Sequence, residues 1–276
     1  MKIEELFKVE GFGCIVTGGA SGLGLGFTEA MAENGARVTM LDVDKDGIDK
    51  EVQRLRGLGY DVDGKVVDVR DHPALDAAFA DVNGKYGRLD AVFANAGIDS
   101  GPGFVKGWVS EGRTRNDEGA IENYDDERWQ RVIDINLTGA FATIRAAARY
   151  MKPRKFGRII ATTSMAATHT EPSIGMAYNT AKAGLAHFVR NVGLELAAYN
   201  IAVNSIAPGF FITNIGGGHA HNPDLQKQVS KSIPMHRVGF PDDMKGLALF
   251  LASPACNYIT GQQIGIDGGW SLGTAD

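Results

Sequence analysis

Short runs of β-branched and apolar residues alternate with longer segments of helical period along almost the whole chain. The apolar runs, which predict strands, cover 12–18, 36–42, 62–69, 89–97, 158–164, 201–209 and 262–266. The segments that predict helices cover 22–34, 45–57, 72–86, 125–151, 176–199 and 242–252. Such alternation is typical of βαβ units. It predicts an α/β fold: a single domain over 1–276 with a Rossmann-type, doubly wound parallel sheet of about seven strands and helices on both faces.

Two glycine-rich segments, 98–123 and 210–236, interrupt this alternation, and each directly follows a predicted strand. In a doubly wound sheet, the loops after the strands lie at the carboxyl edge, where ligands bind. We therefore expect 98–123 to be an insertion near the site and 210–236 to be a substrate loop.

Composition narrows the class of function. The chain has 28 Lys and Arg against 33 Asp and Glu, a net charge of -5, so nucleic acid and anionic membrane surfaces are disfavoured as partners. The first residues are charged where a signal peptide would be apolar, and two cysteines make no disulfide framework, which predicts a cytoplasmic protein. The 36 glycines follow no repeat, so we expect them to serve particular positions.

The first predicted strand runs into a glycine turn, Thr17-Gly18-Gly19-Ala20-Ser21-Gly22-Leu23-Gly24, and then into a helix. Glycines at 18, 22 and 24 let the backbone approach a pyrophosphate at the helix N-terminus. A glycine cluster alone fits a tight structural turn equally well. The TGxxxGxG spacing resembles the cofactor turn of the classical short-chain dehydrogenase/reductase family.

Asp42 ends the second predicted strand, close to the spacing of about 20 residues expected of the acid that binds the ribose hydroxyls. A 2'-phosphate there would meet like charge, and neither Ala20, Ser21 nor Val43 is basic. The cofactor predicted is NAD.

Tyr178 and Lys182 form an i, i+4 pair on one helix face, which Leu185 and Val189 continue. This pairing also arises by chance. Its value depends on two further residues: Ser164 at the end of a predicted strand, and Asn136 on an apolar helix face. Taken alone, Ser164 is better explained as an ordinary strand-end hydroxyl, and Asn136 as a core amide that bends or caps a helix.

Together, Asn136, Ser164, Tyr178 and Lys182 resemble the catalytic tetrad of the same family, and the resemblance extends from Gly11 to Gly269. It implies that Tyr178 is the general acid/base, Ser164 holds the substrate oxygen, Lys182 binds the nicotinamide ribose, and Asn136 positions a water that passes the proton to solvent. The resemblance also implies a homotetramer built on 125–151, 176–199 and the C-terminal strand region. The cofactor-binding residues implied are Gly18, Ser21, Gly22, Leu23, Gly24, Asp42, Asp68, Val69, Asn95, Ala96, Gly97, Tyr178, Lys182, Pro208, Gly209 and Thr213.

The chemistry sets a requirement on Tyr178. An unperturbed tyrosine with a pKa of about 10 is a poor base near neutral pH, so the tyrosinate must be stabilised. A nearby Lys182 ammonium and the positive nicotinamide of NAD⁺ are expected to lower that pKa by about three units.

The function expected is an NAD-dependent oxidoreductase that interconverts a secondary alcohol and a ketone. Alternatives are an NADPH-dependent carbonyl or 3-oxoacyl thioester reductase, and a dinucleotide-binding sensor without turnover. No metal is expected, because His219 and His221 have no ligand triad near them in the sequence. The sequence does not identify the substrate.

The insertion 98–123 is longer than this family commonly has, and we expect it to shape the substrate entrance opposite 210–236. Its aromatic and aliphatic residues would cover apolar substrate, and its two arginines would meet a carboxylate or remain solvated. The alternative is that it packs on a neighbouring subunit. The residues in question are Phe104, Val105, Trp108, Val109, Arg113 and Arg115.

Overall fold

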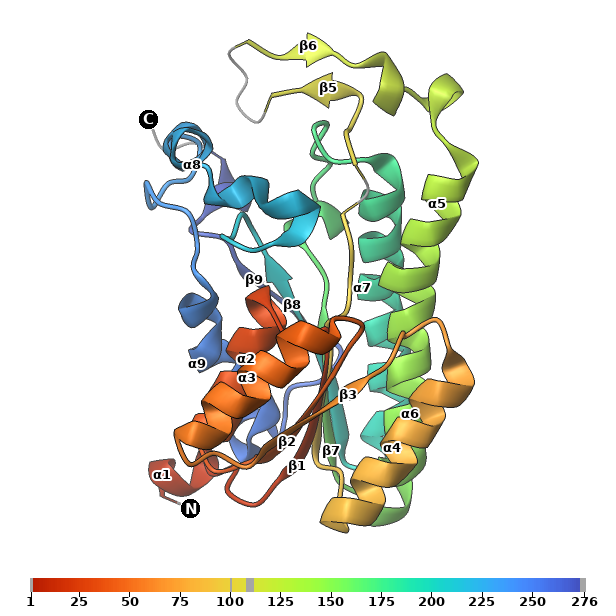
Figure 1. The fold of residues 1–276 in the computed structure, drawn as a ribbon, viewed down its shortest axis with the longest axis vertical. Coiled ribbons are helices and arrows are strands. Elements are labelled where there is room, and N and C mark those ends of the chain that lie inside the picture. The colour runs from red at the N-terminus through yellow and green to blue at the C-terminus, as the bar shows by residue number, and fades with distance from the viewer. Residues whose placement is uncertain (1, 100, 108–111, 274–276) are drawn as a thin grey trace.

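The computed structural model describes residues 2–99, 101–107 and 112–273. Its centre is a seven-stranded sheet in the order β3-β2-β1-β4-β7-β8-β9, with all neighbours parallel (Figure 1). The predicted sheet is confirmed. The strands are β1 Gly13–Thr17, β2 Arg37–Asp42, β3 Val62–Val66, β4 Ala91–Ala94, β7 Gly157–Thr162, β8 Ile201–Pro208 and β9 Gln263–Ile266.

Helices cover both faces of this sheet, because its central strands are buried at every position and need apolar partners on each side. One core cluster joins the sheet to α4, α6 and α7, and the other joins it to α2, α3 and α9. No described helix has the length and apolar character needed to cross a membrane. The helices are α1 Ile3–Leu6, α2 Gly22–Glu33, α3 Lys45–Gly57, α4 His72–Tyr86, α5 Asp126–Ile133, α6 Ala140–Arg154, α7 Met176–Ala197, α8 Pro223–Ser230 and α9 Pro241–Ala252.

The helix predicted over 125–151 differs from the single helix expected. It consists of α5, a π-helical turn Asp134–Gly139, and α6. Asn136 lies in this turn and donates to the carbonyl oxygens of Val132 and Ile98, so its amide ties the widened turn to the segment that follows β4. Widened turns of this kind are frequent at functional sites.

The two segments outside the pattern contain structure of their own. In 98–123, β5 Val105–Lys106 and β6 Thr114–Arg115 form an antiparallel pair, which projects beyond the sheet at the end where α8 lies (Figure 1). In 210–236, a 3-10 helix Ile215–His221 precedes α8. Asn222 caps α8 by accepting from the N–H groups of Asp224 and Leu225.

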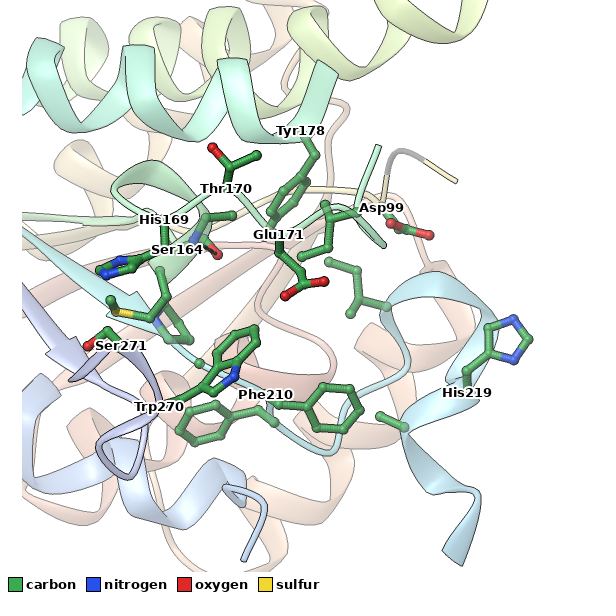
Figure 2. A pocket seen from close by; sticks show the side chains of 18 of the residues that line it. Asp99, Ser164, His169, Thr170, Glu171, Tyr178, Phe210, His219, Trp270 and Ser271 are labelled. Carbon is green, nitrogen blue, oxygen red and sulfur yellow. Dashed lines mark hydrogen bonds between the residues drawn. The ribbon is translucent and has the colours of Figure 1, made fainter. Parts of the chain in front are cut away.

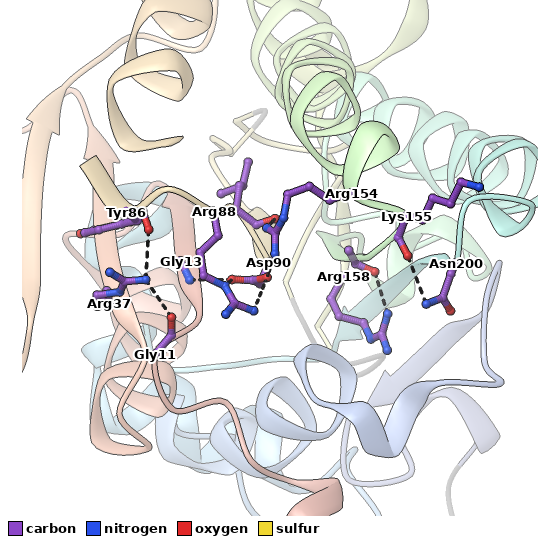
Figure 3. Close-up of polar contacts among 12 residues, drawn as sticks. Gly11, Gly13, Arg37, Tyr86, Arg88, Asp90, Arg154, Lys155, Arg158 and Asn200 are labelled. Atoms are coloured by element: carbon purple, nitrogen blue, oxygen red, sulfur yellow. Dashed lines mark hydrogen bonds and ion pairs between the residues drawn. The ribbon is translucent and has the colours of Figure 1, made fainter. Parts of the chain in front are cut away.

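The amino edge of the sheet carries a compact group of polar contacts (Figure 3). Asp90, fully buried, accepts from Gly13 N at 2.9 Å and from Arg88 and Arg154. Arg158, also buried, donates to backbone carbonyls and to Asn257. These contacts fasten the beginnings of the central strands.

Candidate active site

A cavity of about 500 Å³ lies at the carboxyl edge of the sheet. The structure brings every residue predicted to bind the cofactor to this one cavity. Residues not singled out in the sequence also line it, among them Arg70, Arg131, Thr162 and Asn214. The predicted residues found there are Gly18, Ser21, Gly22, Leu23, Gly24, Asp42, Asp68, Val69, Asn95, Ala96, Gly97, Tyr178, Lys182, Pro208, Gly209 and Thr213.

The glycine turn is closed too tightly to admit a side chain at position 24. A Cβ on Gly24 would lie 1.9 Å from the carbonyl oxygen of Gly18 and 2.6 Å from the amide of Asn95. The Asn95 amide donates to Thr17 O and Gly18 O, which holds the turn against the end of the fourth strand. The backbone at the start of α2 is therefore fixed and open toward the cavity, as a pyrophosphate site requires.

Asp42 lies at the last position of β2 and reaches back to the glycine turn. Its Oδ2 accepts from Ala20 N at 3.1 Å, and its Oδ1 accepts from Asp44 N at 3.1 Å. The other predicted acid, Asp68, is held by Arg70 through its side chain and backbone, and these hydrogen bonds keep the pKa of Asp68 low although partial burial opposes them.

Tyr178 and Lys182 lie in the first turns of α7, on the face that packs against the sheet. Leu185 and Val189 continue that face and are buried, as expected. The Lys182 ammonium donates to Thr162 O at 2.8 Å and lies 5.4 Å from the centre of the Tyr178 ring. Within the described part of the chain, no carboxylate pairs with Lys182, and burial lowers its pKa to about 8.

Ser164 follows β7 and faces Tyr178 (Figure 2). Its hydroxyl accepts from Ala166 N at 3.1 Å, which fixes its rotamer. Burial nevertheless raises the pKa of Tyr178 to about 12, with the Ser164 hydrogen bond lowering it and the Asp99 carboxylate raising it. The direction of this shift is opposite to the lowering expected from Lys182 and the positive nicotinamide of NAD⁺.

Asn136 lies beside Gly97 and is fully buried. A Cβ on Gly97 would be 2.7 Å from Asn136 Oδ1 and 3.5 Å from Lys182 Nζ. The missing side chain at position 97 thus leaves room between the amide and the ammonium. Ser164, Tyr178 and Lys182 line this corner of the cavity, and Asn136, the fourth residue of the predicted tetrad, lies beside Gly97 without lining it.

A second cavity, of about 600 Å³, adjoins the first and is lined mainly by apolar side chains. Figure 2 shows Trp270 and Phe210 across the opening from Tyr178, with Glu171, Asp99 and His169 around it. Sequence reasoning missed Trp270, His169 and Glu171. Trp270 follows the last strand in a turn where Asp267 accepts from Gly269 N and Ser271 N, a pattern that offers no cue to a ligand.

The insertion contributes Asp99 to the lining of this cavity and also contacts the segment 171–173, of which Glu171 lines the cavity. Gly103 N donates to Ser173 O at 3.1 Å, Val105 N donates to Pro172 O at 3.2 Å, and Arg113 pairs with Glu171 at 3.0 Å. Phe104 and Val105, expected to cover substrate, line a separate shallow cavity with Arg113 and Arg115 instead. Trp108 and Val109 lie outside the described residues.

The two histidines of 210–236 have separate surroundings. His219 is in the lining of the larger cavity, and His221 Nε2 forms a hydrogen bond with Asn214 Oδ1 at 3.0 Å.

Comparison with known proteins places this site in a family. The model of the family described as enoyl-(acyl carrier protein) reductase matches residues 18–271. A 3-oxoacyl-[acyl-carrier-protein] reductase of Thermotoga maritima is 34% identical over 263 residues, which is 95% of this chain and 98% of that protein. A 3alpha-hydroxysteroid dehydrogenase of Mediterraneibacter gnavus is 31% identical over 256 residues, 92% of this chain and 94% of that one.

A solved structure supports the same relationship. The NADPH-dependent 3-quinuclidinone reductase of Rhodotorula rubra superimposes with a TM-score of 0.83 at 30% identity, covering 98% of this chain and 95% of that chain. Because one family model spans nearly the whole chain and relatives at this identity cover almost all of it, the protein belongs to the short-chain dehydrogenase/reductase family of oxidoreductases.

Proposed function

We propose that this protein interconverts a secondary alcohol and a ketone with NAD as its preferred cofactor and Tyr178 as general acid/base. One observation carries the proposal: the two cavities meet at Ser164 and Tyr178, which line both. A substrate oxygen held at these two hydroxyls would lie between a dinucleotide site and an apolar chamber, the arrangement that hydride exchange with a carbinol carbon needs.

The residues of the smaller cavity fit a nicotinamide dinucleotide. The glycine turn, whose Gly18 and Gly24 line the cavity at the start of α2, suits a pyrophosphate. Asp42 suits the adenosine ribose, and Lys182 suits the nicotinamide ribose. When bound, the cofactor supplies the hydride chemistry.

The preference for NAD rests on Asp42. Its carboxylate ends β2 beside the glycine turn, where it accepts from Ala20 N, and Arg70, a basic residue of the same cavity, is engaged by Asp68. A 2'-phosphate would therefore face a negative charge. The Rhodotorula relative is NADPH-dependent, so the preference needs a direct test.

That test is Asp42→Asn, which keeps an acceptor for Ala20 N and removes the charge. We expect the ratio of kcat/KM with NAD to kcat/KM with NADP to fall by about tenfold, with Asp46→Asn, an exposed neighbour in α3, as the matched control. Equal use of both cofactors by the wild type would contradict the assignment.

The proton chemistry follows from burial. With a pKa near 12, Tyr178 is protonated at neutral pH and can donate to the carbonyl oxygen of a ketone held by Ser164. Lys182, charged below its pKa of about 8, then stabilises the tyrosinate that remains. In alcohol oxidation the same charges must lower the pKa of Tyr178 before it can accept a proton.

Asn136 completes this proposed proton path. Its Oδ1 accepts from Ile98 N at 3.3 Å, and a carbonyl oxygen has a second lone pair, which faces the room left by Gly97. We assign to it the holding of a water beside Lys182, through which Tyr178 exchanges its proton with solvent.

A reductase acting on 3-oxoacyl thioesters with NADPH is the second candidate. The 34% identical relative from Thermotoga, a 3-oxoacyl-[acyl-carrier-protein] reductase, favours it. The two candidates differ in cofactor and in substrate, so one set of assays separates them.

The segments around the larger cavity define its entrance in this proposal. Phe210, Ile215, His219 and Leu225 bring 210–236 to one side of it. The insertion 98–123 contributes Asp99 to the lining and supports Glu171 from outside. We propose that the insertion acts on substrate binding by holding that wall.

We further propose a cytoplasmic homotetramer. Leu194 is 81% exposed on α7 and Phe141 is 38% exposed on α6, so both long helices offer apolar surface. The cytoplasmic part of the proposal fits both cysteines, Cys14 and Cys256, which are buried free thiols. Light scattering after size exclusion measures the assembly, and a monomer at micromolar concentration would contradict it.

The experiment for the activity is incubation with NAD⁺ or NADP⁺ and a panel of secondary alcohols, and with the reduced cofactors and ketones or 3-oxoacyl thioesters, following the absorbance of the reduced nicotinamide. We expect turnover of alcohols with NAD⁺ and a loss of at least about 100-fold in kcat for Tyr178→Phe, with cofactor binding retained. Turnover confined to thioesters with NADPH would favour the second candidate.

A further inference from the structure

We propose that the cavity beside Tyr178 selects against anionic substrates and takes alcohols and ketones whose apolar body carries no carboxylate or phosphate. This inference rests on the proposed function, since it concerns the substrate of that site.

Apart from its histidines, the ionisable side chains that line the cavity are acidic. Asp99 and Glu171 bring two carboxylates to it, and within the described residues no lysine or arginine is part of the lining. The residues outside the described ranges, at 1, 100, 108–111 and 274–276, include no lysine or arginine, so none of them adds such a charge. Lys182 lines the cofactor side, where its ammonium is engaged by Thr162 O.

The two carboxylates are not equivalent. Glu171 Oε1 accepts from Arg113 at 3.0 Å and from the hydroxyl and N–H of Ser173, and its side chain is only 13% exposed. The Glu171–Arg113 pair is neutral as a whole, so the charge that a substrate meets comes mainly from Asp99.

Asp99 also lies close enough to act on the reacting centre. It is in the lining of both cavities, and after burial its charge contributes to the raised pKa of Tyr178. An anionic group a few ångströms from the same carboxylate would be repelled in the same way, and no fixed cation in the lining offsets that repulsion.

The rest of the lining suits an apolar ring. Phe210, Trp270, Met165 and Ile174 surround a chamber of about 600 Å³, a size that encloses a compact small molecule. A carboxylate or phosphate buried there would lose its hydration without gaining a charged partner.

Three ketones with the same reacting carbonyl test this selection: acetophenone, 4-acetylbenzoate and 4-(aminomethyl)acetophenone, each reduced with NADH at pH 8. We expect kcat/KM for the neutral and cationic compounds to exceed that for the carboxylate by about tenfold or more.

Asp99→Asn should reduce this ratio at least about threefold, and Asp117→Asn, an exposed acid of the same insertion with the same change in charge, should leave it unchanged. Taking ratios cancels any general effect of Asp99 on Tyr178. Equal use of the carboxylate by the wild type, or an unchanged ratio in Asp99→Asn, would overturn the inference.

Binding of the same three compounds to the protein with NAD⁺, titrated by saturation-transfer NMR, separates this inference from the proposed function. If none is turned over but the neutral and cationic compounds bind at least about tenfold more tightly, the selection stands and the proposed activity fails. Tighter binding of the carboxylate, or no binding of the other two, overturns the selection whatever the activity.

Discussion

The two edges of the sheet both bury charged or polar side chains, but they satisfy them differently. At the amino edge, Asp90 accepts from two arginines and a backbone N–H, and Arg158 donates to two carbonyls and an amide (Figure 3). At the carboxyl edge, Lys182 donates to one carbonyl, and no carboxylate among the described residues pairs with it.

This difference separates stability from chemistry. A buried charge with fixed partners holds strands in place, because removing a partner leaves the rest unsatisfied. A buried group with too few partners shifts its pKa instead, as Tyr178 does upward and Lys182 does downward. The carboxyl edge thus keeps two groups whose proton affinities respond to what binds beside them.

The largest effect is expected from Asp90→Ala. It leaves Arg88, Arg154 and Gly13 N without their acceptor, and breaking a buried pair of this kind costs about 3–5 kcal/mol of the free energy of unfolding. Denaturant unfolding measures the loss, with Asp117→Ala as an exposed control. The folded fraction should keep the wild-type KM for cofactor, and an unchanged unfolding midpoint would show that the amino edge is not a structural anchor.

Lys182→Met should have the opposite effect on stability. Its pKa of about 8 is below the unfolded value, so wild type pays a folding penalty that is complete below about pH 8 and disappears as pH rises toward 10.5. Removing the charge should raise the free energy of unfolding at pH 7 by about 1–3 kcal/mol, after the lost hydrogen bond to Thr162 O is subtracted, while turnover falls steeply.

The increase in the free energy of unfolding should shrink with rising pH. The control Lys231→Met, at an exposed lysine, should show no such increase. A variant less stable than wild type at pH 7 would mean that Lys182 is a structural residue like Asp90, and the contrast between the edges would fail.

Arg113→Gln should give the smallest effect of the three. It tests an ion pair at the carboxyl edge by removing its cation. Loss of its contact with Glu171 should raise KM for substrate about three- to tenfold, with the affinity for NAD unchanged. Arg115, whose guanidinium lies over the Phe104 ring, is the matched control as Arg115→Gln. If both variants lower stability and leave KM alone, the insertion serves the fold or an interface, and its proposed role at the entrance is lost.

The parts of the site also differ in how well they can be predicted from the sequence. The period of the apolar residues places Gly24, Asp42, Ser164 and Tyr178 at strand ends and on one helix face, and the sheet brings strand ends together. These positions therefore follow from local patterns plus topology, and the seven-stranded parallel sheet is as predicted.

Other features depend on contacts between distant segments, which no local pattern contains. The π turn at Asn136 involves the carbonyl of Ile98, and the insertion pairs with Pro172 and Ser173 through backbone groups. Trp270 reaches the cavity from the end of the chain. Such contacts are visible only once the fold is assembled.

The most direct test of the account is the ionisation of Tyr178 itself, measured as the ultraviolet difference titration of wild type minus Tyr178→Phe. Because burial raises the pKa of Tyr178 to about 12, the account predicts no tyrosinate signal from this residue below about pH 10 in the free protein, and a signal nearer neutral pH once NAD⁺ is bound. A signal near pH 7 without cofactor, or no change on adding NAD⁺, would contradict it.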